Sequence, residues 1–360
     1  MIFYFFQLAI FFCYSLFFYF VRPNFLRTYY VFITIQLSLV MGLRDYWIGT
    51  DTRQYVGIFL SQDTSFNGNG VAAYNFLSKT IWNLTNGNYH VFLLALSFLT
   101  VLFFILSLQK LKSDFFESFI AVFIYISFYF YFESFNIQRQ MLAVSIAMFA
   151  TCFFIERKYL KALTFFLLAV GIHSTALIAL LNFALIKIKK DKKSLVVSMI
   201  ALSIMLANVN IILQLFAEIF SHYTMYISTV GSGSLAAGGG ALILGLFFIL
   251  VAGTAFFMTD AFSSKIYSFT FFATVLGSLF YIIGMNSQML IRIADYFLIF
   301  APVFIPRAIK KISNRFLQKN IVNCFCCAIV LIAGLTIMTY KLLNNFGDIV
   351  PYSSDIRFWM

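Results

Sequence analysis

Four arginines stand in or beside strongly apolar sequence. Arg44 follows a long apolar run, Arg139 begins another, Arg292 lies inside a third, and Arg53 belongs to the polar stretch after Arg44. A guanidinium group stays charged in a low-dielectric site and presents a rigid fork that fits phosphate oxygens. A buried arginine near a membrane is costly and usually faces a partner or a cavity. These side chains are therefore candidates for binding a ligand that carries phosphate.

The first polar cluster reads G-L-R-D and then, after three residues, G-T-D-T-R-Q-Y. Asp51 is expected to cap a short helix that begins at Thr52, with Tyr55 one turn further along. A carboxylate at this place, Asp51 or Asp45, could accept a proton from an attacking hydroxyl group. The structural alternative is an Arg44–Asp45 ion pair at the membrane interface, with Asp51 acting only as a cap.

The second cluster is the octapeptide E-S-F-N-I-Q-R-Q, which separates two apolar runs. Asn136 and Gln140 are four residues apart, so they share a face if both are helical. Arg139 lies between them at the start of an apolar helix, and Gln138 precedes it. The alternative is an arginine whose side chain extends along apolar surface until its charge reaches water.

Two further places put polar side chains inside apolar sequence. Arg292, Asp295 and Tyr296 are separated by spacings that put them on one face of a helix. His173 stands in the middle of another apolar stretch. A structural Arg–Asp pair and a packed histidine are the alternatives.

Composition places these residues in a membrane protein. Of the 360 residues, 62% are hydrophobic and only 11% are charged, against about 25% charged residues in a soluble domain. The net charge of +12 arises mostly from short loops between apolar runs, which indicates topology and argues against a nucleic-acid partner. The five cysteines lie in apolar runs away from histidine, so we expect no metal site. We predict one all-α membrane domain over residues 1–360.

A helix needs about 20 apolar residues to cross a bilayer. The candidate spans are Ile2–Val21, Thr28–Leu43, Tyr89–Leu108, Phe115–Phe132, Ile137–Ile155, Ser194–Asn208, Ala241–Met258, Ile266–Met285, Leu290–Ile305 and Ile321–Thr339. With a re-entrant hairpin, the chain would have about 10–12 membrane segments. Because lysine and arginine favour cytoplasmic loops, we predict an external amino terminus, which leaves most of the 25 basic residues inside.

The apolar stretch at residues 160–186 does not fit a simple span, because both of its flanks are strongly basic. If both ends are cytoplasmic, the chain must enter the membrane and return. Each arm of about 11–13 residues would then cross little more than half of the hydrocarbon core. We predict a re-entrant hairpin with His173 at its tip, facing protein or a wet cavity. One long tilted span is the alternative.

Three external segments remain: residues 44–88, residues 210–240 and the carboxyl-terminal tail. Ordinary solvated roles are expected for the tail residues Asp348, Tyr352 and Arg357. The predicted topology places four arginines on one external face: Arg44, Arg53, Arg139 and Arg292. Arginines and carboxylates without a metal-ligand cluster suit a substrate that brings its own phosphates, such as a lipid-linked pyrophosphate at the outer leaflet.

The order of these motifs resembles that of the EpsG-type/Wzy bacterial polysaccharide polymerases, including O-antigen polymerases. The resemblance runs from about Gly42 to Tyr352 and is carried by G-L-R-D, G-T-D-T-x-x-Y, N-x-Q-R-Q-x-L-A, G-x-H-S-T-A-L, R-x-x-D-Y-F and a late P-Y. It implies a GT-C-like glycosyltransferase of the bacterial cytoplasmic (inner) membrane that needs no metal or other cofactor and works on the outer side. Its partners would be undecaprenyl-pyrophosphate-linked glycans, membrane lipid, a chain-length regulator and a flippase.

The resemblance also implies roles for the clustered residues. The growing chain on its lipid carrier would be the donor, and a hydroxyl group of the incoming lipid-linked repeat unit would attack it. The expected pyrophosphate ligands are Arg139 and Arg292, assisted by Arg44. The candidate bases are Asp51 first, then Asp45 and His173. The residues expected to orient sugar groups or complete the site are Tyr55, Asn136, Gln138, Asp295 and Tyr296.

Three other functions remain open on the sequence. A membrane O-acyltransferase could use His173 as its base, but no second catalytic histidine or H-x-x-x-D motif accompanies it. A flippase or other transporter of lipid-linked sugars would be expected to show inverted repeats, and none is visible. An O-antigen ligase, which transfers the finished glycan to a different acceptor, would use the same chemistry.

Overall fold

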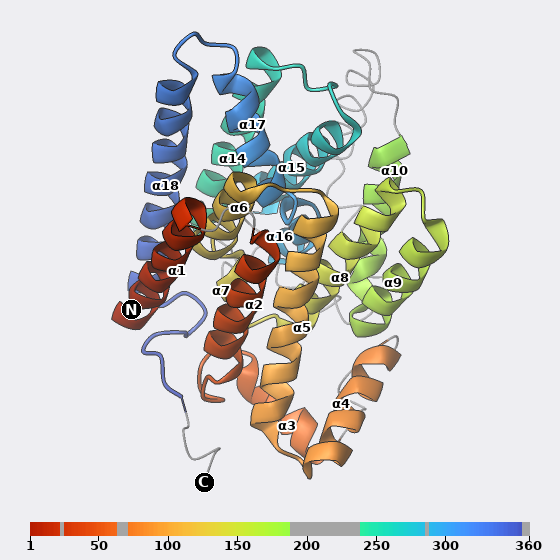
Figure 1. Cartoon of the computed structure of the whole chain (residues 1–360). Coiled ribbons are helices and arrows are strands. Elements are labelled where there is room, and N and C mark those ends of the chain that lie inside the picture. The colour runs from red at the N-terminus through yellow and green to blue at the C-terminus, as the bar shows by residue number, and fades with distance from the viewer. Residues whose placement is uncertain (22–24, 63–70, 188–237, 285–287, 355–360) are drawn as a thin grey trace. The chain divides into compact units, whose positions relative to one another are not determined.

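Helices make up the regular structure of the chain (Figure 1). The computed structural model describes residues 1–21, 25–62, 71–187, 238–284 and 288–354. Over these residues the predicted all-α class is confirmed, since no strand occurs among them. The chain divides into two compact units that are described separately. Unit 1 comprises Met1–Leu177 and Gln318–Met360, and unit 2 comprises Ile178–Leu317.

Unit 1 is built around apolar helices joined by short turns. Its helices are α1 (Ile2–Val21), α2 (Leu26–Gly42), α3 (Thr52–Ser61), α4 (Ala72–Thr85), α5 (Tyr89–Lys110), α6 (Phe115–Ser127), α7 (Phe130–Glu133), α8 (Gln138–Ile155), α9 (Tyr159–Ile172) and α18 (Lys319–Leu343). Side-chain caps determine where two of them begin. Asn88 accepts hydrogen bonds from the first turn of α5, and Asp114 accepts one from Glu117 in α6. Among the described helices long enough to span a membrane, α8 has the largest share of buried residues.

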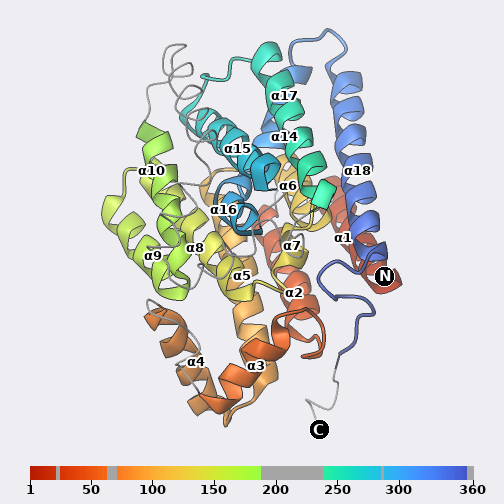
Figure 2. The same cartoon turned by 180° about the vertical axis from the view of Figure 1, so that it is seen from behind.

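Unit 2 contains a second set of apolar helices, seen from behind in Figure 2. They are α10 (Leu180–Lys187), α14 (Gly238–Met258), α15 (Lys265–Ile283), α16 (Gln288–Leu298) and α17 (Ala301–Ser313). Helices α15 and α16 approach closely at Gly277, where an added Cβ would lie 2.7 Å from the Leu298 side chain and 2.9 Å from its backbone nitrogen. A glycine at this point therefore allows the two helices to pack.

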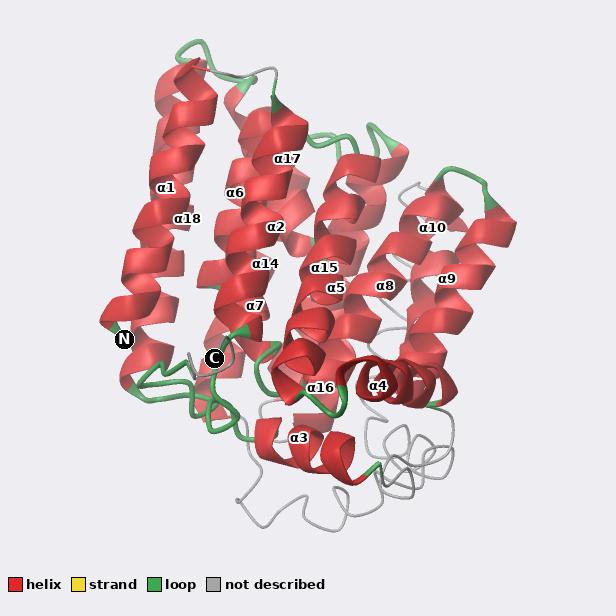
Figure 3. Cartoon of the chain, turned by 60° about the horizontal axis from the view of Figure 1, so that its bottom comes forward, coloured by secondary structure: helices red, strands yellow, loops and turns green. Residues whose placement is uncertain are grey.

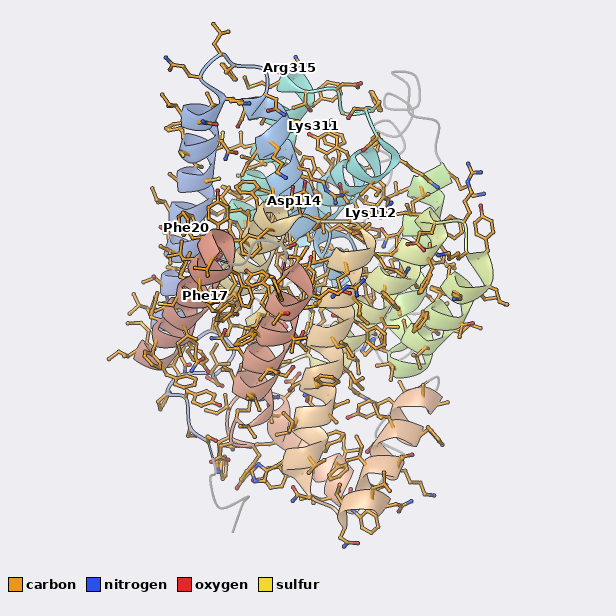
Figure 4. The ribbon with its side chains drawn as sticks, viewed as in Figure 1. Phe17, Phe20, Lys112, Asp114, Lys311 and Arg315 are labelled. Atoms are coloured by element: carbon orange, nitrogen blue, oxygen red, sulfur yellow. The ribbon has the colours of Figure 1, made fainter. Side chains whose placement is uncertain are left out.

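Six of the described helices are long and apolar enough to cross a membrane, namely α1, α5, α8, α14, α15 and α18. Much of the surface of α1 stays outside the protein core. Phe17 and Phe20 are 52% and 74% exposed, and their rings point away from the neighbouring helices in Figure 4. Lipid can cover such a surface, whereas water could not do so without a large free-energy cost. The predicted polytopic membrane class is confirmed.

Several predicted spans differ from the observed helices. Helix α6 ends at Ser127, and Tyr129 adopts a left-handed backbone conformation with φ of 80°, so the predicted continuous span Phe115–Phe132 is wrong. The predicted span Leu290–Ile305 is also not one straight helix, because α16 and α17 meet at a bend of 53°. The predicted span Ser194–Asn208 and most of the predicted external loop 210–240 lie outside the described residues.

The predicted hairpin region is interrupted at the expected residue. Helix α9 ends at Ile172, and His173 is extended, with φ of −151° and ψ of 119°. A 3-10 helix, η2 (Ser174–Ala179), and then α10 follow. Helix α9 has 14 residues, or about 21 Å of rise, which is too short to cross the hydrocarbon core. The return of the chain to the same side remains a prediction.

One end of unit 1 carries the polar segments. Figure 3 shows α3 and α4 beyond the ends of the long helices and lying across them. The segment predicted as an external loop, residues 44–88, is therefore largely helical where it is described. Lys112 and Asp114 lie at the opposite end of unit 1, in the turn between α5 and α6 (Figure 4). Which of these two ends faces the cytoplasm remains a prediction from the basic loops.

Candidate active site

Arg44 lies at the centre of the polar end of unit 1. Its side chain is 0% exposed. The guanidinium donates hydrogen bonds to the Ile48 carbonyl at 3.4 Å and the Phe135 carbonyl at 3.2 Å, and it also donates to the Met41 carbonyl. The Phe135 ring lies 5.0 Å from its Cζ atom. Burial lowers the pKa of Arg44 to about 10, so the group remains charged at neutral pH. Arg44 thus holds the two polar loops together from inside.

Thr52 makes the second link between these loops. Its Oγ1 atom donates to the Ile48 carbonyl at 2.7 Å and to the Phe135 carbonyl at 3.0 Å. Asp51 precedes it as the N-cap residue of α3, but the Asp51 side chain makes no capping hydrogen bond. The predicted capping role is therefore wrong. The Asp51 carboxylate instead accepts a hydrogen bond from the Thr50 hydroxyl at 3.1 Å and is partly exposed.

Asn136 joins the loops on their exposed side. Its Oδ1 atom accepts hydrogen bonds from the Thr50 backbone N–H at 2.7 Å and from the Thr50 hydroxyl at 3.2 Å. Asn136 lies in the turn before α8, which begins at Gln138, so the expected helical face shared with Gln140 is wrong. Asn136 therefore pairs with Thr50, which is distant in the sequence, and not with Gln140 on one helical face.

Two glycines permit the close approach of these loops. Gly49 has φ of 96°, and a Cβ there would lie 2.6 Å from the Phe135 carbonyl oxygen and 2.7 Å from Thr52 Oγ1. Gly347 has φ of 82°, and a Cβ there would collide with the Asn136 amide. Both backbone conformations favour glycine. Space and conformation therefore exclude a larger side chain at these two positions.

The carboxyl-terminal segment 345–354 packs on the same loops. Backbone hydrogen bonds join Asp45 N–H to the Ser353 carbonyl and Gly49 N–H to the Asp348 carbonyl, each at 3.0 Å. The Tyr352 hydroxyl donates to the Val40 carbonyl at 3.0 Å, and its ring stacks on Phe3 at 3.9 Å. The expected solvated role of Tyr352 is therefore wrong. Arg357 lies outside the described residues.

Arg139 occupies an aromatic environment at the start of α8. Its Cζ atom lies 5.3 Å from the ring centre of Tyr55 and 5.2 Å from that of Tyr74. Tyr55 comes from α3 and Tyr74 from α4, and both rings are buried. Gln138, beside Arg139, is 0% exposed, and its amide has no hydrogen-bond partner within the described part of unit 1. The Arg139 side chain, which is itself partly exposed, therefore holds its charge beside two buried rings.

The loops also present exposed groups. The Arg53 guanidinium stacks on the Trp47 indole ring at 3.6 Å, and both side chains are exposed. The Trp47 backbone N–H donates to the Asp45 carboxylate at 3.4 Å. Asp45 and Asp51 are both partly exposed, so either carboxylate can meet a ligand from outside the protein.

His173 lies at the carboxyl-terminal end of α9. Its Nδ1 atom is 2.6 Å from Thr175 Oγ1, and the side chain is partly exposed. Nearby, an added Cβ at Gly171 would lie 2.9 Å from Cβ of Ala73 in α4. The predicted hairpin tip is therefore packed against the helix that carries Tyr74.

The third predicted cluster lies in unit 2. Asp295 and Tyr296 are each 1% exposed, whereas Arg292 is partly exposed. The Tyr296 carbonyl accepts a hydrogen bond from the Asn182 side chain at 2.9 Å, which ties α16 to α10. Within unit 1, the structure brings together six predicted site residues: Arg44, Asp45, Asp51, Tyr55, Asn136 and Arg139.

Sequence reasoning missed Thr50 and Tyr74. Tyr74 lies in a segment treated as a polar loop, yet the buried residues of α4 are Tyr74, Ser78 and Ile81. Their spacing of four and three residues is the pattern of a helix with one buried face. That pattern could have identified α4. Thr50 acts mainly through its backbone N–H, for which residue type carries little information.

A multi-pass membrane protein with a polar, arginine-containing site at one end of its helices is the class that these observations define. The chain belongs to the EpsG family, whose family model matches residues 27–354. This is the family of Wzy/EpsG-type polysaccharide polymerases, and its role is of the polysaccharide-polymerase type. No curated protein and no solved structure matches the chain.

Proposed function

We propose that this protein polymerises oligosaccharide repeat units carried on undecaprenyl pyrophosphate. The reaction takes place at the outer face of the bacterial cytoplasmic membrane and yields O-antigen or a capsule-like polymer. The enzyme is a glycosyltransferase that needs no metal ion. Family membership supports a polymerase-type role, and the arginines at the polar end of unit 1 support a phosphate-bearing substrate.

The linked loops of unit 1 are the observation that carries this proposal. Asn136 is bonded to Thr50, which itself donates to the Asp51 carboxylate. Arg139 follows Asn136 by three residues. It contacts Tyr55 of α3, the helix that begins directly after Asp51. One framework therefore holds a carboxylate that can take up a proton and a guanidinium that can bind an anion. Transfer from a glycosyl pyrophosphate requires both groups.

In the proposed step, the Asp51 carboxylate takes the proton of an acceptor hydroxyl group on the incoming repeat unit. The hydroxyl oxygen forms a bond to the anomeric carbon of the donor chain. The bond between that carbon and the pyrophosphate oxygen breaks, and undecaprenyl pyrophosphate leaves with the bonding electrons. Arg139 stabilises the charge on the leaving group. The sequence-based assignment of Arg292, which lies in unit 2, as a second ligand stays a prediction. Asp45 and His173 are the alternative bases.

The remaining predicted residues take supporting parts in the proposal. Arg44 acts by positioning, because its guanidinium donates to carbonyls of its own chain. Asn136 and Gln138 orient sugar hydroxyls. The sequence-based assignment of Asp295 and Tyr296 of unit 2 to the same task stays a prediction. A chain-length regulator and a flippase are the proposed protein partners. The flippase delivers the repeat units, and the regulator sets the length of the polymer.

Deleting the gene in its native strain tests the proposal. Surface polysaccharide is compared on a silver-stained gel with and without complementation by the wild-type gene. We expect the deletion strain to retain a single repeat unit and lose the ladder of longer chains. Loss of the single unit as well would indicate a ligase or flippase, and an unchanged ladder that differs only in acylation would indicate an acyltransferase.

Complementation with variants tests the base. Asp51→Asn keeps the size of the side chain and its ability to accept from Thr50 but removes its basicity. We expect it to abolish the ladder at a normal protein level in the membrane. Asp348→Asn is the matched control, since Asp348 is an exposed carboxylate at the same end of unit 1. If the strain with Asp51→Asn still makes the full ladder, Asp51 is not the base, and Asp45 or His173 would have that role.

A further inference from the structure

Three elements of unit 1 converge on the Arg139 guanidinium. Arg139 itself belongs to the first turn of α8, Tyr55 is on α3, and Tyr74 is on α4. The two ring centres lie 5.3 and 5.2 Å from its Cζ atom. A cation within about 6 Å of a ring centre and over its face is attracted by the negative face of the ring. The contact strengthens when water is excluded, and Tyr74 is only 1% exposed.

Helix α4 holds Tyr74 in this place through contact with α9. A Cβ at Gly171 would lie 2.9 Å from Cβ of Ala73, the residue before Tyr74. Gly171 has no side chain, so α9 and α4 can approach at this point. A larger residue at this position would force α9 and α4 to shift relative to each other. The Gly171 contact therefore limits where α4, and with it Tyr74, can lie against α9.

We propose that Tyr55 and Tyr74 form an aromatic clamp that positions the Arg139 guanidinium, with Gly171 setting the place of Tyr74. The inference rests on the proposed function, since it assigns to Arg139 the binding of a pyrophosphate oxyanion. A guanidinium binds two oxygens of a pyrophosphate only when its planar fork has the right orientation. By holding the guanidinium against two rings, the clamp restricts the orientations of this fork before a ligand binds. Tyr55 and Tyr74 act as positioning residues.

Binding of undecaprenyl pyrophosphate to the purified full-length protein in lipid nanodiscs tests the clamp. Tyr74→Phe keeps the ring, so we expect wild-type affinity. Tyr74→Leu removes the ring, and we expect about tenfold weaker binding. Tyr55→Leu should act in the same direction. Undecaprenol, which has the same chain without the pyrophosphate, should bind all variants alike, whereas general damage to the fold would weaken both lipids.

Matched variants separate the clamp from general effects on α4 and on helix packing. Phe76→Leu removes another ring from α4, but this ring is 75% exposed and should not matter. Gly171→Ala should reproduce the effect of Tyr74→Leu. Gly57→Ala is its control, because a Cβ at Gly57 meets nothing within 4 Å.

The outcomes distinguish the clamp from the function on which it rests. If Arg139→Ala weakens binding while Tyr74→Leu, Tyr55→Leu and Gly171→Ala bind as the wild type does, the clamp is overturned and the pyrophosphate role of Arg139 stands. If Arg139→Ala binds undecaprenyl pyrophosphate as tightly as the wild type, both assignments are overturned. Equal loss in Tyr74→Phe and Tyr74→Leu would attribute the effect to the hydroxyl group and would also overturn the clamp.

Discussion

The Oδ1 atom of Asn136 accepts a hydrogen bond from the backbone N–H of Thr50 at 2.7 Å. The two residues are separated by 86 positions in the sequence. Their contact joins the loop that contains Asp51 to the loop that leads into Arg139. The geometry of the proposed site therefore depends on a bond between a side chain and a backbone that are far apart along the chain.

Replacement of Asn136 by alanine should uncouple the two loops. The exposed Thr50 N–H would exchange its acceptor in the protein for water, at a cost of about 0.5–1.5 kcal/mol for the lost hydrogen bond. We expect a lower thermal unfolding midpoint in detergent and at least about a tenfold loss of polymer. Thr50→Ala keeps the backbone donor and should have a much smaller effect on both measurements. Equal effects of the two variants would contradict the assigned importance of the backbone bond.

Gly49→Ala should disturb the site by steric contact. Its Cβ would lie 2.6 Å from the Phe135 carbonyl oxygen, at a φ of 96° that alanine disfavours. Backbone strain of this kind costs about 1–3 kcal/mol, before the collision is counted. We expect reduced protein in the membrane and loss of the ladder. Gly57 lies in α3, where an added Cβ would meet nothing within 4 Å, so Gly57→Ala should stabilise the protein by up to about 1 kcal/mol.

Arg44→Lys should destabilise the protein although it keeps the charge. A lysine ammonium cannot reproduce the planar fork that donates to the Ile48, Met41 and Phe135 carbonyls. Thr52 Oγ1 still donates to the Ile48 and Phe135 carbonyls, so the cost is that of the lost charged hydrogen bonds, about 1.5–3 kcal/mol. Arg53→Lys, at an exposed position, is the control and should leave the unfolding midpoint nearly unchanged. If Arg44→Lys has the same unfolding midpoint as the wild type, the planar guanidinium group is not needed for stability.

The dependence of stability on pH also follows from Arg44. Its pKa falls from 12.5 to about 10 on folding, because burial disfavours the charged form. The folded protein therefore holds this proton less tightly than the unfolded chain, and the contribution of Arg44 to stability rises only as pH passes 10. Between roughly pH 6 and 9 this group should add no slope. Unfolding midpoints of the wild type and Arg44→Met should accordingly differ by a constant amount over that range.

Removing the carboxyl-terminal segment should impair the site. Residues 346–354 include the Asp348 and Ser353 carbonyls that accept from Gly49 and Asp45, together with the Tyr352 ring. A chain that ends at Asn345 should still insert into the membrane, because its apolar helices are intact, but it should lose the ladder. A chain that ends at Ser354 keeps these bonds and should retain activity. A full ladder from the shorter chain would contradict this prediction.

The predicted orientation can be checked by labelling with a membrane-impermeant maleimide. In a cysteine-free variant, Gln54→Cys lies on an exposed position of α3 and Lys112→Cys on an exposed position at the opposite end of unit 1. We expect Gln54→Cys to react in intact spheroplasts and Lys112→Cys to react only after the membrane is opened. The reverse pattern would place the proposed site in the cytoplasm and exclude a reaction at the outer face.

Several elements could be predicted directly from the chain. The apolar run Ile2–Val21 coincides with α1, and the predicted helix start at Thr52 is where α3 begins. The interruption at His173 was also expected. These features depend on local composition, because a long apolar run favours a membrane helix and a break appears where polar or small residues interrupt it.

Other expectations were wrong where a distant segment supplied the partner. Asn136 was expected to share a helical face with Gln140, but its Oδ1 atom accepts from the Thr50 N–H, 86 positions away. Tyr352 was expected to be solvated, but it donates to the Val40 carbonyl. In each case a short polar side chain or a tail residue has several possible partners, and sequence spacing shows only the nearby ones.

By itself, the sequence determined that this is a polytopic helical membrane protein, and it identified Arg44, Arg139, Asp45 and Asp51, which lie at the polar end of unit 1. Hydrophobicity and the distribution of charge are properties of the chain that need no knowledge of distant contacts. Only the tertiary structure decided that Arg44 lies buried among carbonyls, that Asn136 binds Thr50, and that Tyr74 contacts Arg139. The physical reason is that backbone carbonyls and N–H groups occur at nearly every residue, so their partners in irregular loops are selected by packing in three dimensions.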